Sequence, residues 1–239
     1  MLITEMLARN ARMYSNKTAL VERDPNRKLR KEITWNAFDR QSNQMAHALM
    51  TRGVKRGDRV ILLMTNCIEW LPIYFGILRT GAWAVPLNFR FDAETILHCA
   101  RVSEAKVLIF GEEFIERIES IKSDLDPVVS DYVFSGPRLL CPNYATYYET
   151  WIEGQDDTDP KVEIGLTDEA ALYFTSGTTG IPKAVLITHR NLEFAAYVEN
   201  CHHRQTHQDN FLCIPPLYHT GAKMHWFGNL IVGARAVIL

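Results

Sequence analysis

The sequence predicts an α/β protein in which mostly parallel sheets are covered by helices on both faces, a doubly wound arrangement. Strand-like apolar runs alternate along the chain with amphipathic stretches at helical spacing. Two of these runs, 59–65 and 106–110, are apolar almost throughout, as expected for strands buried on both faces. The 239 residues are 47% hydrophobic and 23% charged, which is the usage of an ordinary globular protein.

The first element that the pattern predicts is a helix beginning after residue 34. The hydroxyl of Thr34 can cap its first turn, and apolar residues recur at helical spacing as far as Leu49. Gly53 can adopt the left-handed conformation that ends a helix. The apolar run 59–65 follows and is predicted to form the first strand of the parallel sheet.

A second helix is predicted directly after this strand. Asn66 and Glu69 have the spacing of a capping box, and the helix is expected to run to Arg79. Because Pro72 has no N–H to donate, we expect either a helix start close to the proline or a local kink there.

The alternation continues through the next fifty residues. Residues 83–85 form a short predicted strand, Asp92 can cap a helix, and 106–110 supply another strand before a further one at 128–134. The helix between the last two strands is marked by apolar residues at helical spacing. These residues are Phe114, Ile118, Ile121 and Leu125.

A polar and acidic stretch, 154–160, ends in proline and marks a surface linker. We therefore expect a first α/β subdomain over residues 1–160 and the start of a second α/β subdomain over 161–239. The apolar residues 236–239 predict a strand that stops without a turn or a polar tail. This ending suggests a chain truncated at its carboxyl end.

Composition and charge exclude several classes of function. Twenty-six Lys and Arg against 28 Asp and Glu give a formal net charge of −2, so a nucleic-acid partner is disfavoured. The apolar runs are too short to span a bilayer, and the amino terminus lacks the features of a signal peptide. Five scattered cysteines predict neither a disulfide framework nor a zinc site, which favours a cytoplasmic location. Nothing in the sequence indicates the oligomeric state.

A loop rich in glycine and hydroxyl groups separates two strand-like runs, 170–174 and 185–187. Small residues let backbone N–H groups approach phosphate oxygens, while the hydroxyls add donors and a lysine adds positive charge. We therefore predict a phosphate-binding loop. Its residues are Thr175, Ser176, Gly177, Thr178, Thr179, Gly180 and Lys183.

This loop is not the Walker A loop of kinases and GTPases. That motif has glycine directly before its lysine and serine or threonine directly after it. Here Pro182 offers no N–H to a phosphate, and Ala184 offers no hydroxyl to a magnesium ion. The phosphate-cradling geometry must therefore differ.

The segment 175–183, Thr-Ser-Gly-Thr-Thr-Gly-Ile-Pro-Lys, resembles the phosphate-loop signature of the adenylate-forming enzymes. These include acyl-CoA synthetases, peptide-synthetase adenylation domains and firefly-type luciferases. The family usually has glycine where this chain has Ala184, a change that is harmless if the residue lies in a strand. Further similar stretches occur in the same order along the chain: 57–60, 81–88, 188–191 and 216–219.

The resemblance implies the N-terminal, large-domain portion of the acyl-CoA synthetase-like fold and a two-step reaction. A carboxylic acid attacks ATP to give acyl-AMP and pyrophosphate, and the thiol of coenzyme A then forms a thioester, as in fatty acid metabolism. ATP, Mg²⁺ and coenzyme A are the implied cofactors and co-substrates. Lys183, Thr178 and His219 are the implied catalytic residues, and Tyr218 and His219 the implied substrate pocket.

Two alternatives stay open beside this acid:CoA ligase. One is an adenylation domain that transfers its acyl group to a carrier protein, although residues 216–219, Pro-Leu-Tyr-His, are more similar to the CoA ligases. The other is a nucleotide-binding fragment without catalysis, because the family's downstream motifs are not found in these residues. We expect the chain alone to have negligible ligase activity, and its sequence does not indicate which acid is activated.

Six of the eight histidines lie in the last third of the chain, a concentration that could indicate a metal site. His203 and His207 have the i, i+4 spacing that can bring two imidazoles to one ion, with Cys201 or Cys213 as further ligands. The surrounding residues are polar and resemble a solvated helix end. We therefore assign no metal ligand from the sequence.

Overall fold

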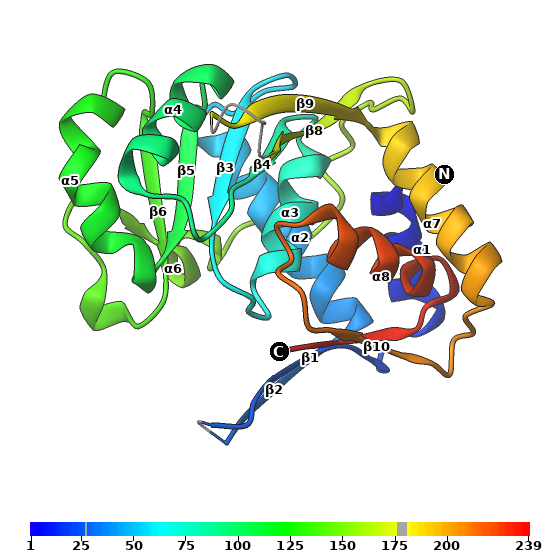
Figure 1. Cartoon of the computed structure of the whole chain (residues 1–239). Helices are drawn as coiled ribbons and strands as arrows, with labels where there is room; N and C mark the ends of the chain where they lie inside the picture. Colours follow the sequence, from blue (N-terminus) through cyan, green and yellow to red (C-terminus); the bar gives the residue numbers. More distant parts are fainter. Residues whose placement is uncertain (27, 176–180) are drawn as a thin grey trace.

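The computed structural model describes residues 1–26, 28–175 and 181–239, and this part of the chain consists of two sheets with flanking helices (Figure 1). The larger sheet has the strand order β7-β6-β5-β3-β4-β8-β9 and is parallel except for the β8–β9 pair. Its strands are β3 (Arg59–Leu63), β4 (Trp83–Pro86), β5 (Val107–Gly111), β6 (Asp131–Ser135), β7 (Thr146–Tyr147), β8 (Glu169–Thr175) and β9 (Lys183–Thr188).

Helices cover both faces of this sheet, as the apolar strands predicted. Side chains alternate along a strand, so Val60 and Leu62 pack into one hydrophobic cluster while Ile61 and Leu63 pack into the other. The first cluster lies under α2 (Trp35–Thr51) and α3 (Trp70–Arg79), and the second under α4 (Ala93–Ser103) and α5 (Ile115–Leu125). The predicted doubly wound α/β fold is confirmed.

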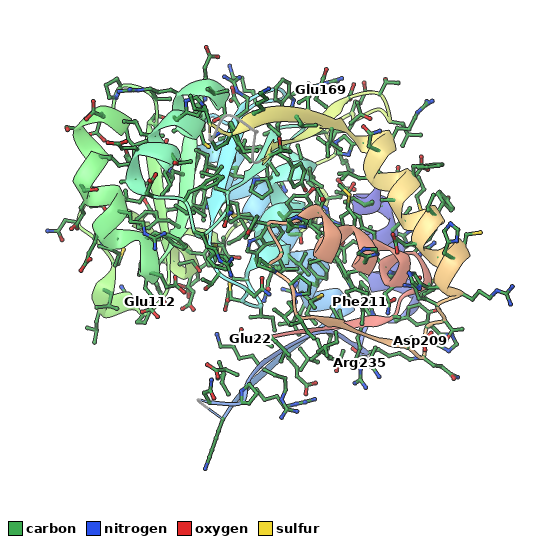
Figure 2. The ribbon with its side chains drawn as sticks, in the orientation of Figure 1. Glu22, Glu112, Glu169, Asp209, Phe211 and Arg235 are labelled. Atoms are coloured by element: carbon green, nitrogen blue, oxygen red, sulfur yellow. The ribbon has the colours of Figure 1, made fainter. Side chains whose placement is uncertain are left out.

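A smaller sheet of four strands lies below the larger one in Figure 1 and has the order β10-β11-β1-β2. Its strands are β1 (Thr18–Asp24), β2 (Leu29–Thr34), β10 (Asn210–Cys213) and β11 (Arg235–Ile238). Figure 2 shows Phe211 and Arg235 on this sheet and Glu169 on the opposite side of the view, at the start of β8. Both sheets take strands from either side of residue 160. The two sheets therefore do not follow the division into subdomains 1–160 and 161–239, which remains a proposal.

The remaining helices are α1 (Ile3–Met13), α6 (Tyr148–Ile152), α7 (His189–His203) and α8 (Thr220–Val232), with short 3₁₀ turns at Glu112–Phe114 and Arg138–Leu140. None of the helices in the described part of the chain combines the length and apolar character that a membrane span requires. The stretch 154–160 forms no helix or strand. It is nevertheless tethered to α2, since Asn43 Nδ2 donates to the carbonyl of Asp157 at 2.8 Å.

Local signals placed several helix ends correctly. The backbone N–H of Ala37 donates to Thr34 Oγ1 at 3.2 Å, and that of Thr95 donates to Asp92 Oδ1 at 2.9 Å, so both predicted caps are present. Gly53 has φ of 75° just after α2, the left-handed conformation expected of it.

The predicted cap at Asn66 is wrong. Helix α3 begins at Trp70 after Glu69, without a side-chain cap, and Pro72 therefore lies in the first turn, where its missing N–H costs nothing. Asn66 instead bonds distant backbone: its Nδ2 donates to the carbonyls of Pro215 at 3.2 Å and Leu239 at 3.0 Å. Its side chain joins segments far apart in the sequence.

Candidate functional site

The two ends of the predicted phosphate loop lie side by side on an antiparallel hairpin. Thr175 ends β8, Lys183 begins β9, and the two residues are directly paired in the ladder. Thr175 Oγ1 donates to the carbonyl of Lys183 at 3.4 Å. Both side chains are exposed at the loop end of the hairpin. The remaining predicted members, Ser176, Gly177, Thr178, Thr179 and Gly180, lie outside the described residues.

The alanine that departs from the family pattern lies in this hairpin. Ala184 is the second residue of β9 and pairs with Phe174 of β8. An extended strand position accepts any side chain without backbone strain. The alanine therefore imposes no backbone strain on the strand that follows the motif lysine.

The second group of predicted residues lies at the start of α8. His219 is its N-cap, and its Nδ1 accepts a hydrogen bond from the backbone N–H of Gly221 at 3.0 Å. The preceding Tyr218 is half-buried and meets Phe89 edge to face, with ring centroids 5.5 Å apart. The imidazole of His219 is exposed and therefore accessible to a ligand.

One aromatic residue connects the two groups. Phe89 follows β4 and packs against the hydrophobic cluster on the α4–α5 face of the sheet. Phe174, directly before Thr175, packs against the same cluster. Tyr218 therefore contacts the apolar surface that also supports the loop end of β8. Among the described residues, no hydrogen bond joins Tyr218 or His219 to Thr175 or Lys183.

A buried lysine makes a second connection, which the sequence reading missed. Lys223 is fully buried in α8, and its Nζ donates to the hydroxyl of Tyr173 in β8. The same nitrogen lies 4.6 Å from the ring centroid of Tyr173, 4.7 Å from that of Tyr74 and 5.4 Å from that of Trp70. Burial outweighs these contacts and lowers the pKa of Lys223 well below its usual range. The signal in the sequence was that Lys223 is the one Lys, Arg, Asp or Glu residue in α8.

A buried histidine lies where β9 turns into α7. His189 follows Thr188, which forms a capping box with Asn191, and the His189 backbone N–H donates to the carbonyl of Asp168 at 2.9 Å. The His189 side chain is only 1% exposed, and burial lowers its pKa from 6.5 to about 4. The imidazole is therefore neutral in the folded protein at neutral pH.

The helical spacing of His203 and His207 on which a shared metal site would depend is not kept in the structure. Helix α7 ends at His203, and Arg204 adopts a left-handed conformation, so His207 does not continue the helical spacing. The ring of His207 instead stacks on Tyr14, with centroids 6.1 Å apart. Cys213, considered as a further ligand, is fully buried.

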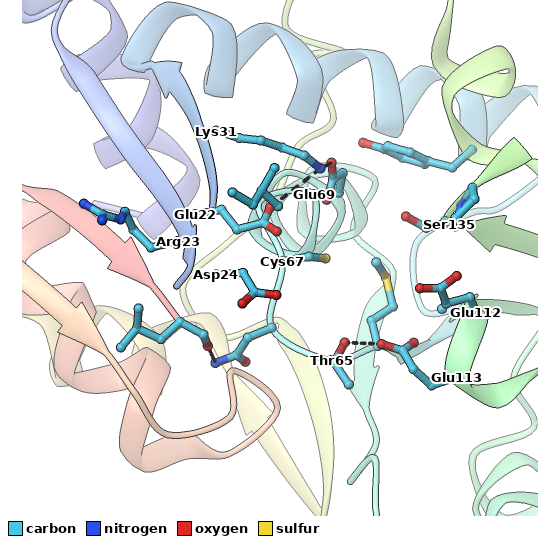
Figure 3. Close-up of a pocket in the computed structure, with 18 of the residues that line it drawn as sticks. Glu22, Arg23, Asp24, Lys31, Thr65, Cys67, Glu69, Glu112, Glu113 and Ser135 are labelled. Carbon is cyan, nitrogen blue, oxygen red and sulfur yellow. Dashed lines mark hydrogen bonds and ion pairs between the residues drawn. The ribbon is translucent and has the colours of Figure 1, made fainter. Parts of the chain in front are cut away.

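A cavity of about 710 Å³ opens at the carboxyl ends of β3, β5 and β6, facing the β1–β2 hairpin (Figure 3). Such edges of parallel sheets are common ligand sites. Within the cavity Lys31 Nζ lies 3.3 Å from Glu69 Oε1, and Thr65 Oγ1 donates to Glu113 Oε1 at 2.6 Å. Its lining carboxylates are Glu22, Asp24, Glu69, Glu112, Glu113 and Glu149, and its lining cations are Arg23 and Lys31.

This acidic lining is unsuited to phosphates. Like charges at short range raise the energy of an anion, so the cavity disfavours both ATP and a carboxylate substrate. Burial and Glu69 raise the pKa of the Cys67 thiol well above its usual range, so it supplies no thiolate nucleophile. The charge of its lining therefore argues against this cavity as an anion site.

The glycine- and hydroxyl-rich segment of the sequence thus joins the two strands of an antiparallel hairpin at the edge of a doubly wound sheet. A family model described as "AMP-binding enzyme" matches residues 7–239. The chain belongs to this AMP-binding enzyme family.

Individual relatives agree with the family assignment. A crotonobetaine/carnitine–CoA ligase of Citrobacter koseri is 29% identical over 210 residues, which are 87% of this chain and 40% of that protein. The solved structure of an anthranilate CoA ligase in complex with anthranoyl-AMP has a TM-score of 0.92 at 29% identity, covering 100% of this chain and 45% of that one. The N-terminal domain of FACL13 from Mycobacterium tuberculosis gives 0.86 at 29% identity, covering 99% and 56%. The chain thus spans less than half the length of the ligase from C. koseri.

We predict that Lys223→Met removes a pH dependence from the stability. Because the folded state lowers the pKa of Lys223, the unfolded state binds more protons up to the ordinary value of 10.5. The free energy of unfolding of the unmodified protein therefore rises with pH below that value. Urea unfolding at about pH 7 and about pH 9.5 should show that the free energy of unfolding of the variant falls relative to that of the unmodified protein as the pH rises. The exposed Lys161→Met is the matched control; an equal pH response in both variants would contradict the prediction.

We predict that His189 reduces stability in mild acid. Its pKa is about 4 in the folded protein against 6.5 when unperturbed, so stability is lost as the pH falls from 6.5 towards 4. The full loss corresponds to about 3 kcal/mol. In urea unfolding across this window, His189→Gln should flatten the dependence of the unfolding free energy on pH. The exposed His202→Gln should leave it unchanged, and an unaltered slope in His189→Gln would refute the assignment.

Proposed function

We propose that the protein to which this chain belongs activates a carboxylic acid with ATP and transfers the acyl group to coenzyme A. In the first step a carboxylate oxygen attacks the α-phosphorus of ATP, and the bond to pyrophosphate breaks. In the second step the thiol of coenzyme A attacks the acyl carbon and AMP leaves. The observation that carries the proposal is the hairpin holding Thr175 and Lys183 at the two ends of a family signature loop.

Charge stabilisation is the proposed task of the loop. Phosphoryl chemistry depends mainly on positioning and on stabilising the charge that develops on the phosphate oxygens. Lys183 is exposed and forms no ion pair among the described residues, so its charge is available to an anion. Thr178 is proposed as a second catalytic donor, and the other loop residues as ATP ligands. Mg²⁺ is expected with ATP, and we assign it no ligands.

Tyr218 and His219 are proposed to border the acyl group. The edge-to-face contact with Phe89 fixes the Tyr218 ring, and the cap bond with Gly221 fixes the His219 ring. His219 Nε2 is then the ring nitrogen left to face the acyl group or the incoming thiol. This arrangement supports a positioning role near the site of thioester formation.

We propose no particular carboxylic acid as the substrate. Two of the relatives are named as a crotonobetaine/carnitine–CoA ligase and an anthranilate CoA ligase, and these names specify different acids. All five cysteines are free thiols, which supports the cytoplasmic location that we include in the proposal. Transfer to a carrier protein instead of coenzyme A remains the alternative acceptor.

The first test is pyrophosphate exchange into ATP over a panel of fatty, aryl and amino acids, using a protein that contains this chain and its continuation. At least one carboxylic acid should support exchange, and Lys183→Ala should lower kcat/KM about 10²- to 10³-fold because one charge-stabilising donor is lost. Lys161→Ala, an exposed lysine away from the loop, should leave it unchanged. Residues 1–239 alone should give no acyl-CoA.

Several outcomes would overturn this assignment. Exchange with amino acids alone, followed by transfer only to a carrier protein, would replace the CoA ligase by an adenylation domain. Exchange that is equally fast in Lys183→Ala would remove the loop from the chemistry. ATP binding without exchange for any acid would leave a nucleotide-binding protein without ligase activity.

The proposed role of His219 in thioester formation can be separated from its role as a helix cap. Asparagine also caps helices well, so His219→Asn should keep the stability of α8 whereas His219→Ala should lose about 1 kcal/mol. If the imidazole faces the acyl group, both variants should lose thioester formation to a similar extent while pyrophosphate exchange persists. Rates of acyl-CoA formation and of exchange, measured side by side, check this. Full activity in His219→Asn would show that His219 is only a cap.

A further inference from the structure

Helices α7 and α8 approach each other closely near the carboxyl end of α7. A Cβ placed on Gly228 of α8 would lie 2.9 Å from Glu199 Cβ and 3.0 Å from the backbone nitrogen of Asn200. Such distances are too short for a side chain, so the absence of one lets the helices touch. Asn200 Nδ2 also donates to the carbonyl of Gly228 at 3.4 Å. The spacing between the two helices is therefore fixed at this point.

Three side chains that can bind metals converge beside this contact. Glu199 and His203 are four residues apart on α7 and share one face of that helix. His225 lies three residues before Gly228 on α8, almost one turn away. One oxygen, Glu199 Oε2, is 2.6 Å from His225 Nδ1 and 3.3 Å from His203 Nε2.

We propose that Glu199, His203 and His225 form a binding site for a divalent transition-metal ion, with Zn²⁺ as the expected occupant. One ligand atom from each residue lies within 4.8 Å of the other two. Two imidazoles and one carboxylate are a donor set that zinc accepts. No role in acid activation is needed for this site, so it stands independently of the proposed function.

The geometry needs only small side-chain movements to hold an ion. Zinc ligands at about 2.1 Å in a tetrahedron are separated by roughly 3.4 Å, close to the distance between Glu199 Oε2 and His203 Nε2. The shorter contact of Glu199 with His225 would lengthen as the ion replaces that hydrogen bond. Both imidazoles are exposed, so an ion can enter from solvent and water can complete the coordination.

The consequence of such an ion is a cross-link between two helices. Helix α7 begins directly after β9, which starts at Lys183, and α8 begins directly after His219. An ion bridging Glu199 and His203 to His225 would join the carboxyl-terminal half of α7 to the middle of α8. We therefore assign the ion a structural role.

Calorimetric titration of the metal-free protein with Zn²⁺ tests the proposal. The unmodified protein should bind one Zn²⁺ ion. In His225→Ala and in Glu199→Gln this binding should be lost, or its affinity should fall at least about 10-fold. His207→Ala and Cys201→Ser remove nearby potential ligands outside the site and should retain it. Circular dichroism confirms that each variant is folded.

Thermal unfolding gives a second measurement that does not depend on activity. Zn²⁺ should raise the Tm of the unmodified protein, and EDTA should reverse the increase, because an ion that binds only the folded state stabilises it. His225→Ala should show neither change. Unchanged zinc affinity in His225→Ala and Glu199→Gln, or the absence of binding up to about 1 mM Zn²⁺ in the unmodified protein, would overturn the proposal.

Discussion

The burial of one lysine among three aromatic rings is the constraint on which the geometry of the candidate site depends. Lys223 is fully buried, and its amine has the Tyr173 hydroxyl as its hydrogen-bonding partner. Moving α8 away from β8 would leave a buried polar group unpaired, at a cost of about 1–3 kcal/mol. Because Lys223 lies one turn after His219 and Tyr173 two residues before Thr175, this contact positions α8 against the loop-bearing strand.

The ends of the central strands add further connections. Phe89, after β4, contacts Tyr218, and Asn66, after β3, accepts a hydrogen bond from the backbone N–H of Leu217 at 2.8 Å. Asn66 also donates to the carbonyl of Leu239, just after β11. The carboxyl ends of neighbouring parallel strands thus hold the segment before α8 in place. The doubly wound sheet serves the site by bringing these ends to one edge.

The sequence predicted the central strands of the large sheet because they are mostly apolar, a local property that needs no knowledge of partners, but it did not predict the two-residue strand β7. It did not predict β2, whose residues Leu29–Thr34 alternate poorly and include three charged side chains in a row. Asn66 was misassigned because an asparagine before a helix commonly caps it; its actual partners lie 149 to 173 residues away. Likewise, Glu199, His203 and His225 come from two helices, so no linear spacing could reveal their convergence. By contrast, the loop signature could be identified from the sequence because all its residues are contiguous.

The near-neutral net charge conceals a division of charge between two surfaces. Six carboxylates line the cavity beside β3, β5 and β6 against two cations, whereas the loop end of the β8–β9 hairpin presents Lys183 and the hydroxyl of Thr175. Carboxylates disfavour a nearby polyanion and an exposed lysine favours one, over distances set by a screening length of about 8 Å. A small net charge of −2 therefore does not argue against binding ATP. In the proposed function the anion binds beside the exposed Lys183, on a hairpin whose Tyr173 and Phe174 pack against the two hydrophobic clusters of the sheet.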